Sequence, residues 1–482
     1  MAAANRGPVS FRPGPGRGFS ARFEGGAASG ALAPFTGLLP IKWVSAFSGE
    51  GDRLEQERVG DASIQGRGLP DGCTARFVIP PRRMFHRYYN VICNPLLWLL
   101  HHRMWNLTHT PTIDQSVVDG WERGFAPVNQ LFADGISAEL ADRQQPPLIM
   151  FRDYHLSLAP AMVRDRFPDA LMQHVLDVPW PGPDHWEALP FEWRRQLFRG
   201  LLSNDIVGFQ TARDRRSFMN CVDEFVPDAE SDNKEFSIAC DSRLVRLKVY
   251  PSAINPESLE RIGGSARVAE LVRGLEQPGI THTFARVDRA EPNKNIVRSI
   301  KGFRELLAER PDIKGTVRYV LSLAPAPPHL AQYRRYAEEI TQAAMAVNQE
   351  FGRDGWAPVQ LRLENNYPAA VAALKSYDTL IVTPTADGNA VSAKEGPVLN
   401  RRDGLMIISE GAGPWEKFSD IALTVAATDI AGTAQAMSVA VDMPSAQRGR
   451  IAGELRSTAL AYEPLALACR QVEDLLDAAG TR

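Results

Sequence analysis

The chain has 482 residues, which is too long for one hydrophobic core and fits two domains of ordinary size. Hydrophobic residues make up 44% of the chain and charged residues 23%, as in an ordinary globular protein. The formal net charge of -3 excludes the basic surface that binding to nucleic acid or to an anionic membrane requires, so neither partner is expected.

The cysteines and the N-terminal residues indicate the cellular compartment. Five cysteines are scattered along the chain without a CxxC pairing, which argues against a disulfide framework and against a zinc site. The first residues, Met-Ala-Ala-Ala-Asn-Arg, contain no apolar segment of a signal peptide. The longest apolar run, 91–100, is broken by Asn94 and Pro95 and is far shorter than the ~20 residues that span a bilayer. We therefore expect a cytoplasmic protein.

Short apolar runs alternate with helical periodicity from about residue 146 onwards. Strands are predicted at 148–151, 171–176, 206–209, 281–286, 317–323, 379–383, 405–409 and 421–425, and helices at 191–202, 296–307 and 330–348. This alternation predicts an α/β fold with parallel sheets that are covered by helices on both faces.

The predicted elements fall into two halves, which we expect to be two Rossmann-like domains. A polar stretch with two prolines, 250–256, separates them and suits a linker. The first domain is expected at about 1–250 and the second at about 255–455, and the last helix, over about 457–482, is a candidate to cross back to the first domain. Segments 11–35 and 48–72 are rich in Gly, Pro and Arg and are predicted to be loops.

Ligands of open α/β sheets bind beyond the carboxyl ends of the strands, so the residues that follow the strands are the candidate site. Asp153 directly follows a buried strand, although an aspartate there also serves as a helix N-cap. Arg289 and Lys294 lie between a strand and a helix. Two cations beside a helix N-terminus can clamp a pyrophosphate, and a solvated basic loop is the alternative.

A third polar cluster, 383–395, also follows a strand and opens a helix. Gly388 lets the backbone approach a ligand closely, and the first N–H groups of the helix can bind phosphate oxygens. Glu395 can accept hydrogen bonds from a ribose diol, and a capped helix with an acidic first turn is the alternative. Near the N-terminus, Gly25 and Gly26 belong to a glycine-rich loop that is not a complete GxGxxG motif, and a surface turn is the alternative there.

These clusters, in this order, resemble the trehalose-6-phosphate synthase family of retaining glycosyltransferases, and especially its actinobacterial members. The similar stretches lie at 5–10, 88–98, 153–156, 178–181, 208–211, 289–298 and 387–395, and the resemblance covers about residues 5–440. It implies a GT-B fold, in which two Rossmann-like domains face each other across a cleft. It also implies a hexosyltransferase that binds a nucleotide sugar on one domain and an acceptor on the other.

The resemblance implies roles for individual residues. Arg289 and Lys294 would bind the donor pyrophosphate and steady the leaving nucleotide. The other residues implied on the donor side are Gly25 and Gly26, which would close over the donor, Asp177, Asp387, Gly388 and Asn389 near its sugar, the backbone of Val391 and Ser392 at its phosphates, and Glu395 at its ribose. Those implied on the acceptor side are Arg6, Tyr89, Trp98 and Asp153, the last of which would lie between the two sugars.

The family also implies the chemistry and the partners. Such enzymes need no metal and no cofactor, and they retain the anomeric configuration while the leaving phosphate deprotonates the acceptor on the same face. Catalysis then consists mostly of positioning and of stabilising charge on the departing nucleotide. The expected partners are a GDP-, UDP- or ADP-linked sugar and a small acceptor molecule, and a homo-oligomer is left open.

Three positions depart from the family pattern. Asp177 stands where the family has a histidine that contacts the donor glucose near its 6-hydroxyl. As an anion it can accept from a hydroxyl, pair with an amino group, or reflect drift. Pro327 aligns with an arginine that grips the acceptor's phosphate. Losing that bond costs about 1.5–3 kcal/mol, or ~10–100-fold in affinity, unless Arg6 or the cations at 334–335 replace it. Asn389 marks the third change, in the donor loop.

The nucleotide end of the site therefore keeps the family pattern, while both sugar-recognition surfaces differ from it. We expect a retaining transferase that moves a sugar or pseudo-sugar to a hydroxyl acceptor other than glucose 6-phosphate, in specialised metabolism such as antibiotic or nucleoside biosynthesis. A family member that joins pseudo-sugars in validamycin biosynthesis shows that substrates change, although it keeps the histidine. The alternatives are a genuine trehalose-6-phosphate synthase and a non-catalytic paralog that binds nucleotide sugars.

Overall fold

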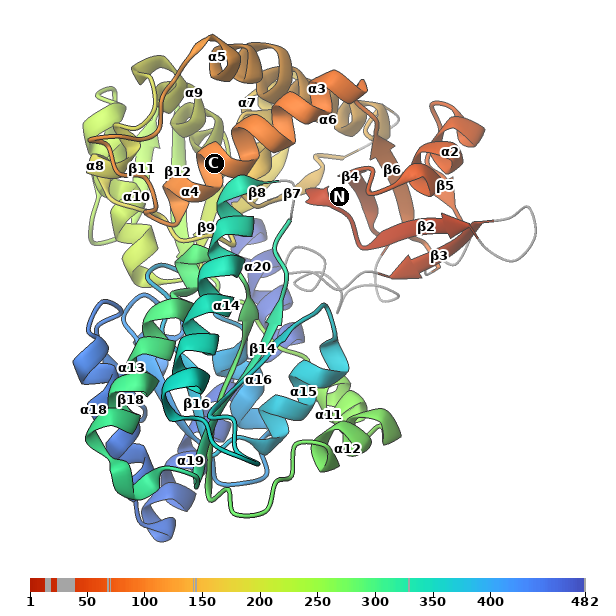
Figure 1. The fold of residues 1–482 in the computed structure, drawn as a ribbon. Helices are drawn as coiled ribbons and strands as arrows, with labels where there is room; N and C mark the ends of the chain where they lie inside the picture. Colours follow the sequence, from red (N-terminus) through yellow and green to blue (C-terminus); the bar gives the residue numbers. More distant parts are fainter. Residues whose placement is uncertain are drawn as a thin grey trace. The chain divides into compact units, whose positions relative to one another are not determined.

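The computed structural model describes residues 1–13, 19–23, 40–66, 69, 71–141, 143, 145–327 and 330–480 (Figure 1). The chain forms two compact units, of which the first comprises Met1–Ala253 and Pro464–Arg482 and the second comprises Ile254–Glu463. In these ranges no helix combines the length and the hydropathy that crossing a membrane requires.

The first unit contains, within the described ranges, a ten-stranded sheet with the order β10-β11-β12-β9-β8-β7-β1-β4-β6-β5. Its strands are β1 (Ala2–Arg6), β4 (Lys42–Ala46), β5 (Ile64–Gln65), β6 (Thr74–Val78), β7 (Leu148–Arg152), β8 (Leu171–Val175), β9 (Ile206–Phe209), β10 (Ala229–Asp232), β11 (Ser237–Cys240) and β12 (Arg243–Val249). From β12 across to β6 the strands run parallel. Counted in chain order, these parallel strands read 7-6-5-4-1-2-3, so the order reverses between β1 and β7.

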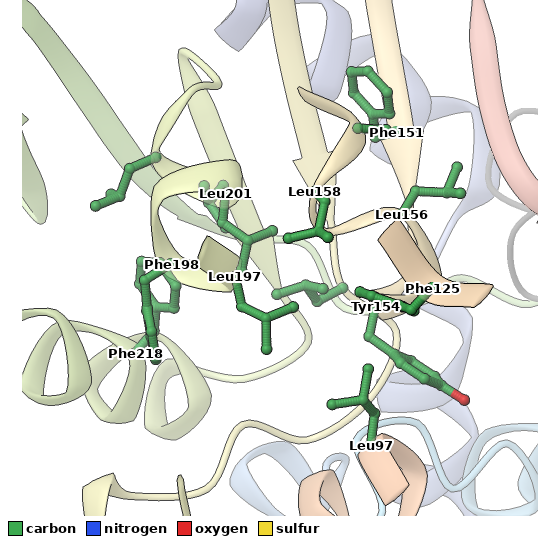
Figure 2. Packing of buried hydrophobic residues seen from close by; sticks show 14 of the residues in the cluster. Leu97, Phe125, Phe151, Tyr154, Leu156, Leu158, Leu197, Phe198, Leu201 and Phe218 are labelled. Atoms are coloured by element: carbon green, nitrogen blue, oxygen red, sulfur yellow. The ribbon is translucent and has the colours of Figure 1, made fainter. Parts of the chain in front are cut away.

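Helices and a separate hairpin complete the first unit. The hairpin pairs β2 (Val9–Pro13) with β3 (Phe19–Phe23). The helical segments are α2 (Glu50–Val59), α3 (Arg82–Arg87), η2 (Tyr88–Leu97), α4 (Trp98–His101), α5 (Gln115–Gly120), η3 (Trp121–Phe125), α6 (Ala126–Glu139), η4 (Tyr154–Leu156), α7 (Ala159–Arg166), α8 (Pro183–Trp186), α9 (Phe191–Leu202), α10 (Ala212–Phe225) and α20 (Pro464–Ala479). Figure 2 shows part of the core that these helices bury, including the rings of Phe198 and Phe218, whose centroids are 5.7 Å apart.

The second unit has a six-stranded parallel sheet with the order β15-β14-β13-β16-β17-β18 in the described part of the chain. Its strands are β13 (His282–Arg289), β14 (Val317–Ala324), β15 (Val359–Leu363), β16 (Thr379–Val382), β17 (Leu405–Ser409) and β18 (Leu423–Val425). In chain order this is 3-2-1-4-5-6, the order of a Rossmann fold, with its reversal between β13 and β16. The helical segments are α11 (Pro256–Gly263), α12 (Ala266–Arg273), η5 (Pro292–Lys294), α13 (Ile296–Glu309), η6 (Pro311–Ile313), α14 (Ala331–Phe351), α15 (Tyr367–Ser376), α16 (Ser392–Leu399), α17 (Trp415–Phe418), α18 (Ile430–Asp442) and α19 (Ser445–Leu460).

Two expectations about local structure were wrong. Segment 48–72 contains α2 and β5, and segment 11–35 contains β3 and the end of β2, so neither is only a loop. Asp52 of α2 is fully buried, and its carboxylate accepts the N–H groups of Phe11 at 2.6 Å and of Ser48 at 2.7 Å, which fixes the helix against the hairpin. The predicted last helix over 457–482 is in fact two helices, because the chain leaves α19 before Pro464, whose ring suits a helix start and not its interior.

Candidate active site

In the first unit, Arg6, Asp153 and Asp177 lie at the carboxyl ends of three neighbouring strands. Arg6 is the last residue of β1, Asp153 follows β7, and Asp177 follows β8 after one intervening residue. These strands are hydrogen-bonded in the order β8-β7-β1, and the sheet reverses its order between β7 and β1. Open α/β sheets bind ligands at such a reversal, because the loops on either side diverge there and leave a crevice.

Asp153 is held in a strained backbone conformation at this point. Its φ of 68° and ψ of 167° lie in a region that residues other than glycine avoid, at a cost of roughly 1–3 kcal/mol. Its N–H donates to the carbonyl of Val175 at 2.8 Å, and its carboxylate accepts the N–H of Tyr154 at 2.9 Å and lies 3.3 Å from Nδ1 of His155. Burial opposes ionisation, but the hydrogen bond and charge of His155 hold the pKa of Asp153 below its ordinary value.

The predicted acceptor-side aromatics pack on the two residues that follow Asp153. Tyr89 stacks on the ring of His155, with centroids 6.2 Å apart and an interplanar angle of 11°. Trp98 packs on Tyr154, with centroids 6.3 Å apart. Arg6 is exposed and has neither a hydrogen bond nor an ion pair within the described ranges. The structure thus brings Tyr89 and Trp98 together with Asp153, and it leaves Arg6 available at the end of the neighbouring strand.

Asp177 forms a buried ion pair with Arg152, the last residue of β7. Nη2 of Arg152 donates to Oδ1 of Asp177 at 3.1 Å, and their side chains are only 2% and 8% exposed. The same Asp177 oxygen accepts Nε2 of Gln210 at 3.0 Å, while Nη1 of Arg152 donates to Gln471 of α20 at 3.3 Å. Of the alternatives open for Asp177, the structure thus shows a pair with a cation, and that cation is part of the protein itself.

In the second unit, the two predicted phosphate-binding cations lie at the carboxyl end of β13, at the reversal of the sheet: Arg289 is its last residue and Lys294 follows it. Arg289 is 53% exposed and lies 3.1 Å from Glu291. Lys294 is only 13% exposed, contacts the carboxylate of Asp387 and lies 3.8 Å from that of Asp288. Burial disfavours its ammonium group, but these carboxylates raise the pKa of Lys294, so it stays charged. The structure therefore holds one exposed cation, Arg289, and one buried cation, Lys294, which is paired with carboxylates.

The loop after β16 brings the rest of the donor-side residues to the same end of the sheet. Asp387 contacts Lys294, and the Asn389 side chain accepts Nζ of the buried Lys394 at 2.7 Å. The first hydrogen bonds of α16 come from the N–H groups of Ala393 and Lys394, which leaves the N–H groups of Val391 and Ser392 outside the helical ladder. N–H groups at this position of a helix bind anions.

Glu395, the last predicted donor residue, is largely buried on α16. Burial raises its pKa to about 7, although the hydroxyl of Tyr367, at 3.3 Å, and the charge of Lys394 both act in the opposite direction. At neutral pH a substantial fraction of this carboxyl is protonated. Hydroxyl groups that donate to it would stabilise the carboxylate and lower that pKa.

Several site residues were not predicted from the sequence. Arg286 is fully buried in β13 and donates to Asp288 at 3.0 Å, to the hydroxyl of Thr383 at 3.0 Å and to the carbonyl of Lys294. It therefore fixes the loop that carries Lys294. Arg152 was missed in the same way, since an arginine within a strand reads as a solvent-facing residue until the neighbouring strands are known.

Other predicted residues have no demonstrated place in either half of the site. Gly25 and Gly26 lie outside the described residues. Pro327 lies three residues beyond the end of β14 and supplies no donor. Arg334 and Arg335 are exposed on α14.

Comparisons with known proteins show what the chain is similar to. The profile of glycosyltransferase family 20 matches residues 24–474. Validamine 7-phosphate valienyltransferase of Streptomyces hygroscopicus subsp. jinggangensis (strain 5008) is 27% identical over 466 residues, which cover 95% of this chain and 90% of that protein. Glucosylglycerol-phosphate synthase of Synechocystis sp. is 28% identical over 389 residues, or 76% of this chain and 74% of its own.

The fold also has solved counterparts. The crystal structure of an alpha,alpha-trehalose-phosphate synthase (UDP-forming) from Burkholderia vietnamiensis superposes with a TM-score of 0.82 at 23% identity, over 100% of this chain and 98% of that one. At this identity the likeness bears on the fold, and it confirms the predicted α/β architecture of the GT-B class.

Proposed function

Because the chain belongs to glycosyltransferase family 20, we propose that it transfers a sugar or a sugar-like cyclitol from a nucleotide donor to a hydroxyl acceptor other than glucose 6-phosphate, with retention. The family match confirms the resemblance to trehalose-6-phosphate synthases and the prediction of a glycosyltransferase. The donor, the acceptor and the residue roles below are our proposal. They rest on the residues at the carboxyl ends of the strands in the two sheets.

One observation carries the donor side of the proposal. Arg289, Lys294 and the start of α16 all lie at the carboxyl ends of β13 and β16, where the second sheet reverses its order. A diphosphate at that point would meet two cations and unused N–H groups, which are the partners that phosphate oxygens prefer. Glu395 lies three residues after Ser392 on the same helix and would accept hydrogen bonds from the ribose.

In the proposed reaction the bond between the anomeric carbon and the donor phosphate breaks, and the acceptor oxygen bonds to that carbon on the same face. The acceptor proton passes to an oxygen of the leaving phosphate. Negative charge grows on the nucleoside diphosphate, where Arg289 and Lys294 would stabilise it. Removing one such preorganised donor typically costs about 10²–10³-fold in rate. The scheme needs no metal ion and no cofactor.

On the acceptor side, Asp153 with Tyr89 and Trp98 would hold the ring of the acceptor. Support for a changed acceptor comes from Pro327, which aligns with a phosphate-binding arginine of the family. Support for a changed donor sugar comes from Asp177, whose charge is already matched by Arg152. The two relatives are named for validamine 7-phosphate and for glucosylglycerol phosphate, so family members of similar identity differ in what they glycosylate.

A substrate screen tests the proposal. The protein is incubated with GDP-, UDP- or ADP-glucose and with glucose 6-phosphate, or with a panel of unphosphorylated alcohols, cyclitols and nucleosides, and products are detected by mass spectrometry. We expect transfer to a member of the panel and little trehalose 6-phosphate. Rapid formation of trehalose 6-phosphate would contradict the proposed acceptor while leaving the transferase assignment intact.

A genuine trehalose-6-phosphate synthase is the second candidate. The exposed Arg6 favours it, since this cation has no ion pair among the residues that the structure describes and is available for a phosphate. Arg6→Ala separates the two: it should abolish the use of glucose 6-phosphate if Arg6 is the phosphate ligand, and change little for an uncharged acceptor. A non-catalytic paralog would bind a donor tightly and turn over none of the acceptors.

A further inference from the structure

A pocket lies in the second unit, at the opposite end of the sheet from Arg289. It has a volume of about 550 Å³ and is lined by the segment 272–280, the starts of β13 and β14, the end of α15 and the loop that precedes β17. Thr283 in its wall and Arg289 stand six residues apart on the same strand, which is roughly 20 Å. The pocket is therefore separate from the candidate donor site.

Cations dominate its lining. Arg318, Lys375, Arg401 and Arg402 contribute to the wall, and Glu276 is the one acidic residue that does so. Of these cations, Arg402 lies 3.3 Å from Asp378, which it shares with Arg448, and Arg401 lies 3.8 Å from Glu260. Lys375 donates to the carbonyl of Gly263 at 2.6 Å and forms no ion pair with any residue that the structure describes.

Arg318 is a buried cation in this wall whose guanidinium has few partners. Its side chain is 4% exposed, and only Nε has a partner, the hydroxyl of Thr283 at 3.1 Å. Within the described ranges no carboxylate lies within ion-pair distance of its guanidinium, and neither Nη group makes a hydrogen bond. Burial and the charge of Arg402 lower the pKa of Arg318, whereas the charge of the nearby Asp378 raises it. A buried cation with no anion in direct contact is unfavourable, and an anion in the pocket would reduce that cost.

We propose that this pocket binds a small phosphorylated metabolite, with its phosphate on Arg318, Arg401 and Arg402. A guanidinium fork matches two phosphate oxygens at once, which the free Nη groups of Arg318 allow. The apolar side chains of Val272 and Ile280 in the same wall suit the organic part of such a molecule. The volume is in the range that holds small-molecule ligands. The site does not depend on the proposed transfer reaction.

The test is a titration of the full-length protein with inorganic pyrophosphate, measured by isothermal titration calorimetry at low ionic strength, where screening of charges is weak. The starting protein carries Arg289→Ala, which weakens the candidate donor site. Three variants are built on this protein: the double replacement Arg401→Ala with Arg402→Ala, the single replacement Arg318→Gln, and the matched control Arg304→Ala. The control removes a half-exposed arginine of α13 that is paired with Glu350. We expect the pocket variants to weaken one pyrophosphate site by at least ~10-fold and the control to leave it unchanged.

The location is checked by soaking crystals of the unmodified protein with selenate, whose selenium is found by anomalous scattering. A selenate within hydrogen-bond distance of the Nη groups of Arg318 supports the proposal. The proposal is overturned if the Arg401/Arg402 variant titrates like the Arg304 control, or if no selenate occupies the pocket. Arg401 and Arg402 are half-exposed, so their variant remains informative even where Arg318→Gln does not fold.

Discussion

Arg152 and Asp177 are coupled strongly enough that replacing both should destabilise the first unit by less than the sum of the two single replacements. In Arg152→Met the carboxylate of Asp177 stays at 8% exposure and loses the cation 3.1 Å away. In Asp177→Asn the guanidinium stays at 2% exposure without that anion, and its buried Nε already has no partner within the described chain. Either single change leaves a charge in the interior without its counter-ion.

The expected size follows from the geometry. At 3.1 Å and an effective dielectric constant of 20, two unit charges attract by about 5 kcal/mol. Breaking a buried pair by removing one partner costs about 3–5 kcal/mol of the unfolding free energy, whereas replacing both partners removes the desolvation cost as well. We therefore expect each single variant to lose about 3 kcal/mol or more. The double variant should lose less than the sum, with a coupling free energy of about 2–3 kcal/mol.

Chemical denaturation of the wild-type protein, both single variants and the double variant measures this coupling. A matched control cycle uses Arg166 and Asp134, which are 2.7 Å apart with side chains 38% and 50% exposed. That surface pair should couple by less than ~1 kcal/mol. If the buried pair couples no more strongly than the surface pair, the Arg152–Asp177 contact does not hold this part of the site together.

The remaining predictions concern the second unit. Arg289→Ala should lower kcat/KM for the donor by about 10²–10³-fold and should also lower the melting temperature, because Arg289 lies 3.1 Å from Glu291, whose side chain is only 2% exposed. Lys294→Met should lower both, since Asp387 and Asp288 would lose their counter-ion. Burial raises the pKa of Glu395 from 4.5 to about 7, so its contribution to folding stability should fall as pH rises between these values, and donor affinity should rise through neutral pH. Glu395→Gln should flatten both profiles in melting and donor-binding measurements, and an unchanged profile would refute the assignment. Pro327→Arg should lower KM for glucose 6-phosphate by ~10–100-fold, and an unchanged KM in steady-state assays would show that this position does not reach the acceptor.

The sequence predicted the strands that are buried on both faces. β7, β9, β16 and β17 contain at most one polar residue each, and β8 is bounded by apolar residues, so these runs can be recognised without tertiary information. β1, β4 and β6 were not predicted, because Ala-Ala-Ala-Asn-Arg and similar short, mixed stretches show no pattern of their own. Their burial comes from neighbouring strands. The same reason applies to α2, whose buried Asp52 reads as a surface residue in the sequence.

The candidate site could be predicted as far as it consists of residues that follow strands. Asp153 and Lys294 were found in this way, and the structure brings each of them to the reversal point of its sheet. Arg152 and Arg286 lie inside strands, where an arginine normally faces solvent. Their partners come from adjacent strands or from the following loop, and the strand order that creates these contacts is not visible in the sequence.

The contacts of Asp177 bear on whether its departure from the family is drift. A tolerant position would leave the new carboxylate in solvent or unpaired, yet Oδ1 accepts both Nη2 of Arg152 and Nε2 of Gln210. A neutral histidine has only one acceptor nitrogen, so it could not accept hydrogen bonds from both Arg152 and Gln210. The aspartate is thus matched to a buried arginine, and changing residue 177 alone would strand that cation. Any exchange at residue 177 therefore has to accommodate the donors of both Arg152 and Gln210.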